Sequence, residues 1–300
     1  MKQFVKTIHR INYCVYFIFH YFFDSKFYVL RRIIIKNNVE TVNYIIRHKV
    51  SVSRFGDGEL GLISNCNTDF QRYNPAISKK LREVLNVTMP NHIVCIPHPW
   101  KNFWTLKYEA FEYWSSYLTK NLDMKILPYI SPNKIYYDAS FTRFYIDYKN
   151  DNNAKRIIPL IKRIWDERDI YIIEGELTRL GMGNNLLDNA KSIHRIIAPP
   201  LNAFEKYDEI MAAVKGYAPK SVLILIALGM TATCLAYDLS KEGYQAIDIG
   251  HVDIEYEWFL MRSPKRVAIK NKYVSESNER FISDGIKDEL YNSQIVARVL

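Results

Sequence analysis

The chain has 300 residues and 48% hydrophobic content, enough for one large α/β domain or two small ones. Its net charge of +9 is concentrated in residues 1–50, which carry nine Lys and Arg against Asp24 and Glu40, so the basic surface that nucleic-acid binders spread over a folded domain is disfavoured and we expect no nucleic-acid partner. Four scattered cysteines without CxxC spacing argue against a structural zinc site and indicate a reducing compartment.

Residues 1–38 form an aromatic and basic segment. Its longest apolar run, 14–23, is too short for a membrane-spanning helix, which needs about 20 apolar residues, and it lacks the cleavage site of a signal peptide. Two interpretations stay open for this segment. It is either an amphipathic helix lying on the inner face of the cell membrane, or a helix packed on the domain or on a partner subunit.

The first motif with chemical content follows a predicted helix over 39–48 and a predicted strand over 50–55. This strand ends in RFGDGEL, where Gly56 and Gly58 flank Asp57. Asp57 and Glu59 lie two residues apart on an extended or turning backbone, so both carboxylates can point at one cation such as Mg²⁺ or Mn²⁺. Ordinary turn chemistry is the simpler interpretation of the Asp-Gly pair.

The middle of the chain alternates between the two kinds of regular structure. Helical spacing is found over 76–87, 103–118 and 154–165, and strand patterns over 92–96 and 134–137. Arg143 follows the latter strand, as a phosphate contact or a surface charge. No repeat or low-complexity linker occurs, which predicts one continuous domain over 39–275 and a C-terminal tail over 276–300.

A second motif, EGELTRLGMGNNLL, follows a predicted buried strand over 169–173. Arg179 is a fixed cation suited to phosphate oxygens, and Gly181 and Gly183 lead into Asn184 at a predicted helix start. Glycines before a helix N-terminus can form an anion site from backbone N–H groups. The spacing matches neither GxGxxG nor a P-loop, and a helix-capping loop fits equally well.

The third motif lies in a predicted strand-helix-strand unit. Strand 222–227 is followed by Gly229, by Thr231 as the expected N-cap, and by a helix over 232–239; strand 245–249 then ends at Gly250. Together with strands near 51, 92, 134, 170 and 194, this alternation predicts a mostly parallel α/β sheet flanked by helices. Such sheets bind ligands at the carboxyl ends of their strands.

Directly after Gly250 comes an acidic cluster in the sequence HVDIEYEW, which contains His251, Asp253, Glu255 and Glu257. All four share one face if the segment is a strand; if a helix begins near Asp253, that residue is the N-cap and Glu257 lies on the same side. Carboxylates packed together need a cation or a shared proton, so the cluster predicts a metal site or a base with a raised pKa. A solvated helix face is the alternative.

Taken together in this order, the three motifs resemble the GT-D type glycosyltransferases, over roughly residues 39–262. One departure is Met230, where we expect proline. The resemblance implies a Rossmann-like domain, a nucleotide-sugar donor such as UDP-glucose, and a divalent metal, Mn²⁺ or Mg²⁺. It places Asp57 and Glu59 in the metal-binding DxE motif and His251 and Glu257 in the GHxDIEYEW motif.

On this resemblance we expect a cytoplasmic hexosyltransferase, peripheral on the inner membrane face, that glycosylates a glycan, glycolipid or glycoprotein in bacterial surface polysaccharide or adhesin glycosylation. A non-catalytic scaffold of a polysaccharide assembly complex remains the alternative, and a methyltransferase has little use for the carboxylates. The expected catalytic residues are Glu257, His251 and Asp253, and the expected nucleotide-sugar contacts are Arg54, Gly56, Arg179, Asn184, Gly229 and Thr231.

Overall fold

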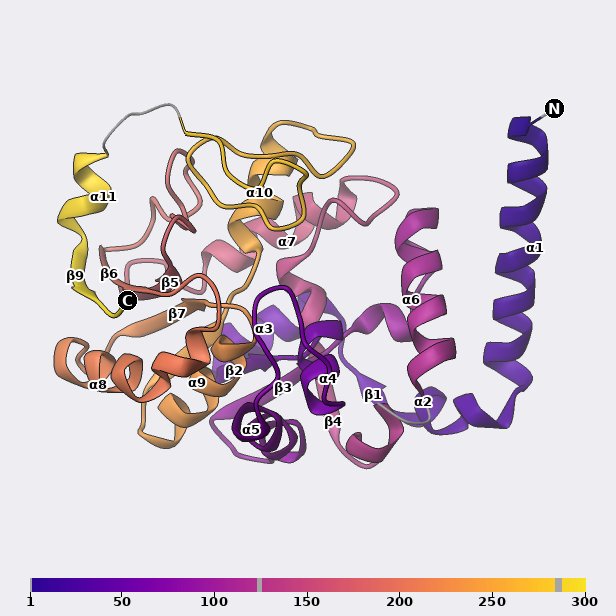
Figure 1. Ribbon diagram of the computed structural model, residues 1–300, viewed down its shortest axis with the longest axis horizontal. Coiled ribbons are helices and arrows are strands. Elements are labelled where there is room, and N and C mark those ends of the chain that lie inside the picture. Colours follow the sequence, from indigo (N-terminus) through magenta and orange to yellow (C-terminus); the bar gives the residue numbers. More distant parts are fainter. Residues whose placement is uncertain (1, 123–125, 284–287) are drawn as a thin grey trace.

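A nine-stranded, entirely parallel sheet forms the centre of the computed structural model (Figure 1), which describes residues 2–122, 126–283 and 288–300. The strand order is β1-β4-β3-β2-β8-β7-β5-β6-β9. The strands in chain order are β1 (Ile34–Ile35), β2 (Ser51–Arg54), β3 (His92–Ile96), β4 (Ile135–Asp138), β5 (Asp169–Gly175), β6 (Ser192–Ala198), β7 (Leu223–Ala227), β8 (Gln245–Asp248) and β9 (Ile295–Arg298).

The central strands are almost entirely apolar, as expected for strands that are covered on both faces. Every residue of β3 and β7 is buried, as expected for parallel strands with helices on each side. All seven predicted strands are present, and the predicted parallel α/β class is confirmed. The sequence pattern missed β1 and β9, which lie at the two edges of the sheet.

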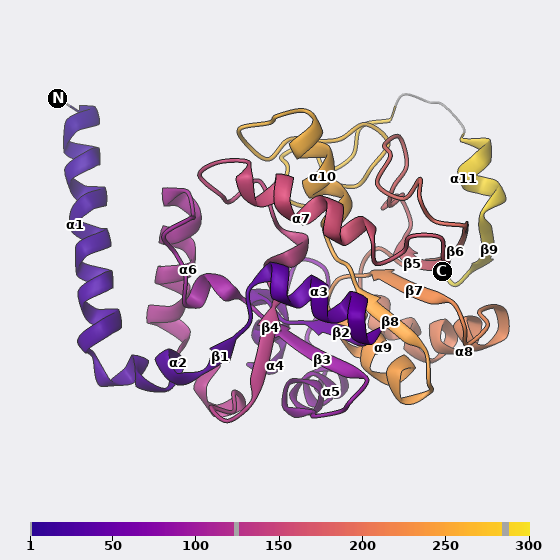
Figure 2. The same cartoon turned by 180° about the vertical axis from the view of Figure 1, so that it is seen from behind.

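Helices cover both faces of the sheet (Figures 1 and 2). One face packs against α3 (Asn38–His48), α7 (Asn152–Lys162) and α10 (Val252–Leu260). The other packs against α4 (Asp57–Ile63), α5 (Pro75–Asn86), α8 (Tyr207–Tyr217) and α9 (Met230–Lys241).

The N-terminal helix α1 (Lys2–Phe23) stands at one end of the molecule beside α6 (Tyr108–Asn121), as both views show. Phe17 is buried on α1, and its ring contacts the rings of Phe103 and Phe111 edge-on at centroid distances of 5.5 and 5.6 Å. The short helix α2 (Tyr28–Arg32) continues this packing. One face of the N-terminal segment is therefore part of the domain core, which confirms the packing interpretation for that face.

The sheet has two halves, which meet along the pair of strands β2 and β8. Val52 is in register with Ile247 on this seam. The Ser51 hydroxyl donates to the carbonyl of Tyr244 at 3.1 Å and accepts from the N–H of Ala246 at 2.9 Å. Residues 34–138 build one half and residues 169–298 the other, so the centre of the sheet joins distant parts of the chain.

The segment predicted as a C-terminal tail is built into the fold. It contains α11 (Glu289–Ser293) and the edge strand β9, which pairs with β6 in parallel. Tyr291 of α11 is buried, and its hydroxyl donates to Glu174 at 3.0 Å. The C-terminal tail set apart at 276–300 thus contributes a helix and an edge strand to the fold.

Candidate active site

The first motif lies where β2 turns into α4. Asp57 and Glu59 occupy the first turn of α4, so they lie on a helix start and not on the extended or turning backbone that the sequence suggested. The Oε2 atom of Glu59 accepts from the N–H of Gly56 at 2.7 Å, which is one half of a capping box; the glycine has no side chain to form the other half. Asp57 is exposed, and the Tyr113 hydroxyl of α6 donates to its Oδ2.

The electrostatics of this turn fit a bound divalent cation. Burial, followed by the nearby negative charge of Asp248, raises the pKa of Glu59 to about 7. A cation beside this carboxyl would favour its ionised form. Within the described part of the chain no three His, Cys, Asp or Glu side chains form a complete metal cage. Asp57 and Glu59 fit the other kind of site, where one or two carboxylates hold Mg²⁺ and water and substrate phosphate complete the shell.

The second turn at this edge lies between β7 and α9. Gly229 has φ +54° and precedes the helix, which begins at Met230, so Thr231 is a buried residue inside the first turn and not the N-cap. A Cβ at Gly58 would lie 3.1 Å from the sulfur of Met230. The helix starts of α4 and α9 are therefore in contact, and the motifs around Asp57 and Gly229 form one surface.

Arg54 holds three strand ends together at the carboxyl edge. Its guanidinium donates to Asp248 Oδ1 at 2.9 Å, to the Thr142 hydroxyl at 2.6 Å and to the carbonyl of Ala139 at 3.2 Å. It passes so close to Gly250 that a Cβ there would lie 1.8 Å from Nη2. Most of its donors are engaged, so its expected contact with a nucleotide sugar remains a prediction beside this evident structural role.

The acidic cluster lies on a helix, and the strand alternative for it was wrong. The helix α10 begins at Val252 with His251 at the N-cap position, so Asp253 is not the cap. Asp253 and Glu257 share one side of α10, as helical spacing predicted. The Lys272 ammonium donates to both of them, at 2.6 and 2.8 Å, and the Asn184 amide donates to both at 2.7 Å.

The sequence analysis predicted that a metal ion or a shared proton relieves the repulsion between these carboxylates. In the structure, the Lys272 ammonium lies between them instead. Its side chain and that of Asp253 are almost fully buried, and Glu257 is 14% exposed. Asn184 is an expected nucleotide-sugar contact, but its side-chain amide donates to the two carboxylates. The single ammonium thus balances one of the two carboxylates, and the Asn184 amide donates to both.

Glu255 points to another side of α10. Its Oε2 accepts from the N–H groups of Tyr145 at 2.8 Å and Ile146 at 3.1 Å. Burial, partly offset by the charge of Arg143, raises the pKa of Glu255 to about 7. The raised-pKa carboxyl that the cluster predicted is therefore Glu255, and its contacts are with the backbone of the fold.

His251 belongs to a network at the N-terminus of α10. Its Nε2 lies 3.3 Å from both Glu276 Oε1 and the Ser275 hydroxyl. Glu276 is also paired with Arg143, and with Arg266 at 2.6 Å. Burial alone would raise the pKa of Glu276, but the charge of Arg143 and the hydrogen bond with His251 hold it well below its usual range.

This network approaches the first motif through Arg143. Partial burial of the Tyr113 hydroxyl and the charge of Asp57 raise the pKa of Tyr113, whereas the charge of Arg143 lowers it. The Tyr113 hydroxyl, which donates to Asp57, therefore lies within the electrostatic influence of Arg143, the ion-pair partner of Glu276. Arg143 was read from the sequence as a phosphate contact or a surface charge; the structure makes it the ion-pair partner of Glu276.

The loop after β5 holds Arg179 at φ +49°. No helix follows at Asn184, so the predicted helix N-terminus was wrong; residues 176–191 form a series of turns. Arg179 instead borders a cavity of about 180 Å³ that is rich in positive charge. Its other lining residues are Met182, Gly183, Lys270, Asn271, Lys272 and Asp288.

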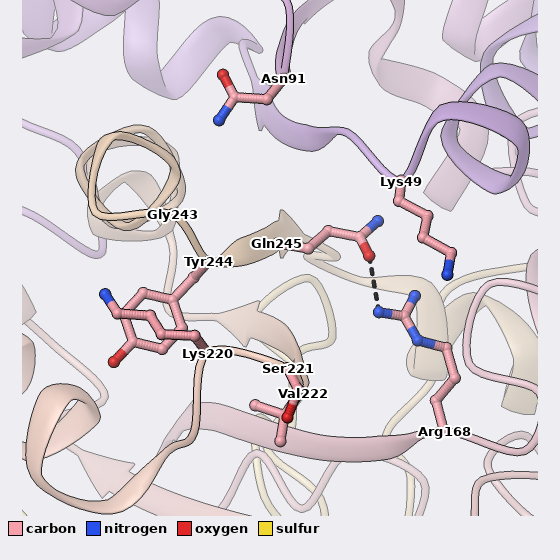
Figure 3. A pocket seen from close by; sticks show the side chains of 9 residues that line it. All are labelled: Lys49, Asn91, Arg168, Lys220, Ser221, Val222, Gly243, Tyr244 and Gln245. Atoms are coloured by element: carbon pink, nitrogen blue, oxygen red, sulfur yellow. Dashed lines mark hydrogen bonds between the residues drawn. The ribbon is translucent and has the colours of Figure 1, made fainter.

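A second cavity lies at the opposite edge of the sheet, where the strands begin. It has a volume of about 260 Å³, and Lys49 and Arg168 extend into it beside Gln245, which accepts from Arg168 at 2.8 Å (Figure 3). None of the sequence-predicted site residues lines it. Ligands of parallel α/β sheets bind at the carboxyl edge, so we place the active site there.

The carboxyl edge thus carries two groups of residues. One gathers Asp57, Glu59 and Gly229, with His251 next to Gly250, against which the Arg54 guanidinium lies. The other gathers Arg179, Asn184, Asp253 and Glu257 around Lys272 and the smaller cavity. Three strand-to-strand steps of about 4.8 Å separate β2 from β5. The residues that the sequence analysis did not identify in these groups are Tyr113, Lys272, Ser275 and Glu276.

A parallel α/β sheet with carboxylates, a paired histidine and basic loops at its carboxyl edge defines a Rossmann-like group-transfer enzyme. Comparison with known proteins makes this class specific. The family model of the glycosyltransferase GT-D fold matches residues 52–277. The chain belongs to this family of glycosyltransferases.

The curated relatives it resembles are streptococcal. The chain is 35% identical over 267 residues to the glycosyltransferase GlyD of Streptococcus pneumoniae serotype 4, and 35% identical over 271 residues to the probable glycosyl transferase Gly of Streptococcus gordonii. These alignments cover 89% and 90% of this chain but only 32% and 39% of the relatives. The chain therefore spans about a third of the length of the curated relatives it matches.

Solved structures show the same fold. A structure described as domain of unknown function 1792 with a distinct glycosyltransferase fold matches with a TM-score of 0.86 and 33% identity, over 92% of this chain and 100% of that chain. A glycosyltransferase of this domain family from Streptococcus sanguinis matches with a TM-score of 0.84 and 34% identity, over 89% of this chain and 100% of that chain. The predicted GT-D type fold is confirmed.

Proposed function

We propose that this protein is a metal-dependent glycosyltransferase that moves a hexose, such as glucose, from a UDP-sugar to a hydroxyl of a glycan, glycolipid or glycoprotein acceptor. The observation that carries this proposal is the pair of carboxylates in the first turn of α4, where the charge of Asp57 is exposed and that of Glu59 is disfavoured without a cation. Family membership supports the transfer of a sugar. The UDP-sugar donor and the metal are proposed from the residues of the site.

Asp57 and Glu59 would hold Mn²⁺ or Mg²⁺. When bound, such an ion stabilises the negative charge that develops on a departing diphosphate. Arg179 and Lys270 border the cavity next to this edge and would attract phosphate oxygens. The backbone after Gly229, at the N-terminus of α9, adds a favourable field for an anion.

His251 is the better of the two candidate bases. The carboxylate of Glu276 beside its Nε2 would hold the proton on that nitrogen and leave Nδ1 free to accept the proton of an acceptor hydroxyl. Glu257, the other candidate, already accepts from Lys272 and Asn184. We therefore assign Glu257 and Asp253 to positioning the loop that carries Lys272.

We place the reaction in the cytoplasm, since the four cysteines are scattered along the chain without CxxC spacing, as is usual in a reducing compartment. We also propose that the acceptor is a molecule of bacterial surface polysaccharide synthesis or adhesin glycosylation. A non-catalytic scaffold is the competing function. The histidine-carboxylate pair favours the enzyme, since a scaffold has no need of it.

The test measures UDP release from a panel of UDP-sugars with Mn²⁺, first for the unaltered protein and then for Asp57→Asn. Asp57 is exposed, so the variant should fold and yet lose at least about 100-fold in kcat/KM, because the ligand for the cation is weakened. A chelator should abolish the activity and added Mn²⁺ should restore it.

Asp166→Asn is the matched control, since Asp166 is an exposed aspartate in the turn before β5, at the opposite edge of the sheet, and its replacement is expected to leave the rate unchanged. Full activity of the Asp57→Asn variant would contradict the metal site. Absence of UDP release from every donor would favour the scaffold.

A further inference from the structure

The outward face of α1 carries an apolar stripe that the rest of the described chain does not cover. Its spacing is helical and keeps to one side of α1, opposite the buried Phe17 and Tyr21. Three central members, Ile11, Val15 and Phe19, are 56%, 62% and 58% exposed. The stripe consists of Ile8, Ile11, Val15, Tyr16, Phe19, Phe22 and Phe23.

The same region carries most of the net positive charge. Residues 1–36 contain seven Lys and Arg against Asp24 alone, a net +6 of the total +9, and α1 contains no acidic residue. Of these cations, Arg10 and Arg32 are exposed, and Arg10 is also paired with Glu109 of α6 at 3.1 Å. Apolar and aromatic side chains flanked by cations are the composition of a helix that lies in the headgroup region of a membrane.

We propose that this stripe docks α1 onto an anionic lipid surface, with its axis parallel to the membrane plane. Among the described residues no helix has the length and apolar character to pass through a bilayer, which agrees with a surface position. The stripe lies at the end of the molecule beside α6, away from α11 and β9 (Figures 1 and 2). A flat surface can therefore reach it.

A second copy of the chain is a weaker occupant for the stripe. Two copies facing each other through α1 would bring two regions of charge +6 together, and this repulsion opposes association. An anionic membrane offers the opposite charge, and basic residues near such a surface each add to the attraction. Charge complementarity thus selects the lipid surface.

The full chain is tested by co-sedimentation with vesicles of phosphatidylcholine mixed with phosphatidylglycerol, and with vesicles of phosphatidylcholine alone. We expect binding to the mixed vesicles that weakens at high salt, because exposed charges are screened. The triple variant Ile11→Ser, Val15→Ser, Phe19→Ser should bind at least about tenfold more weakly, since three side chains no longer leave water on docking.

The matched control is the triple variant Leu201→Ser, Tyr217→Ser, Leu290→Ser, which removes three exposed apolar side chains elsewhere and should bind like the unaltered protein. Circular dichroism checks that both triple variants keep their helices. Equal binding of the α1 variant, or equal binding to neutral vesicles, would overturn the proposal. A dimer that the α1 variant turns into a monomer, without vesicle binding, would assign the stripe to a second copy. The assay needs no sugar donor, so its result is independent of the transferase activity.

Discussion

At the scale of single residues, Lys272 stabilises the acidic cluster. Replacing it by methionine, which keeps the length of the side chain, would leave Asp253 and Glu257 together without a counter-charge. Breaking a buried ion pair from one side costs about 3–5 kcal/mol. We therefore predict that Lys272→Met lowers the free energy of unfolding by about this amount in urea denaturation.

Lys270→Met is the control for this measurement, since Lys270 lies two residues away in the same segment but is exposed. Its effect should stay within about 0.5 kcal/mol. Equal stability of both variants would show that the two carboxylates do not depend on Lys272.

Glu255 predicts a pH dependence of stability. Its pKa is raised to about 7 in the fold by burial, so the folded protein holds this proton more tightly than the unfolded chain, whose glutamate has its ordinary pKa. Its contribution is complete below about pH 4.5 and disappears as the pH rises through 7. Glu255→Gln should therefore flatten the decline in unfolding free energy between pH 5 and about 7.5; an unchanged slope in urea titrations would contradict this assignment.

Part of the site could be predicted from local spacing. Asp253 and Glu257 are four residues apart, and helical geometry alone places them on one side. Lys272 and Glu276 could not be predicted in this way, because they come from an irregular segment without periodicity, and only tertiary folding brings them to α10.

At the scale of elements, the connection between β8 and α10 depends on a glycine. Gly250 has φ +48°, and a Cβ would lie 1.8 Å from Arg54 Nη2, so Gly250→Ala must displace the arginine from Asp248. We predict a loss of about 3 kcal/mol in unfolding free energy. Gly243→Ala is the control, since Gly243 also has positive φ, at +86°, but nothing lies within 4 Å of its added Cβ. It should lose only about 1 kcal/mol; equal losses would mean that the contact with Arg54 is unimportant.

The sequence predicted the elements with strong periodicity and missed those defined by pairing. A continuous apolar run such as Leu223–Ala227 predicts a buried strand. The strand Ile34–Ile35 has two residues and exists because it pairs with β4. The short helix Asp57–Ile63 begins inside a Gly-Asp-Gly sequence, which is typical of a turn and favours a loop interpretation.

At the scale of the whole molecule, α1 and α2 belong to the core although they form the end of the chain. Deleting residues 2–36 would remove at least five side chains whose burial the structure describes, and we predict that Tm falls by at least about 10 °C in a thermal scan. These side chains are Phe17, Tyr21, Phe27, Leu30 and Ile33. An unchanged Tm would instead support the sequence-based boundary near residue 38, with an independent N-terminal module.

The seam between β2 and β8 has a consequence for synthesis of the protein. The Ser51 hydroxyl meets the N–H of Ala246, 195 residues further along the chain. While the ribosome is still translating, the first half of the sheet has an open edge at β2, and contacts of such large sequence separation form slowly. The nascent chain therefore depends on staying unaggregated until β8 has been synthesised and can pair with β2.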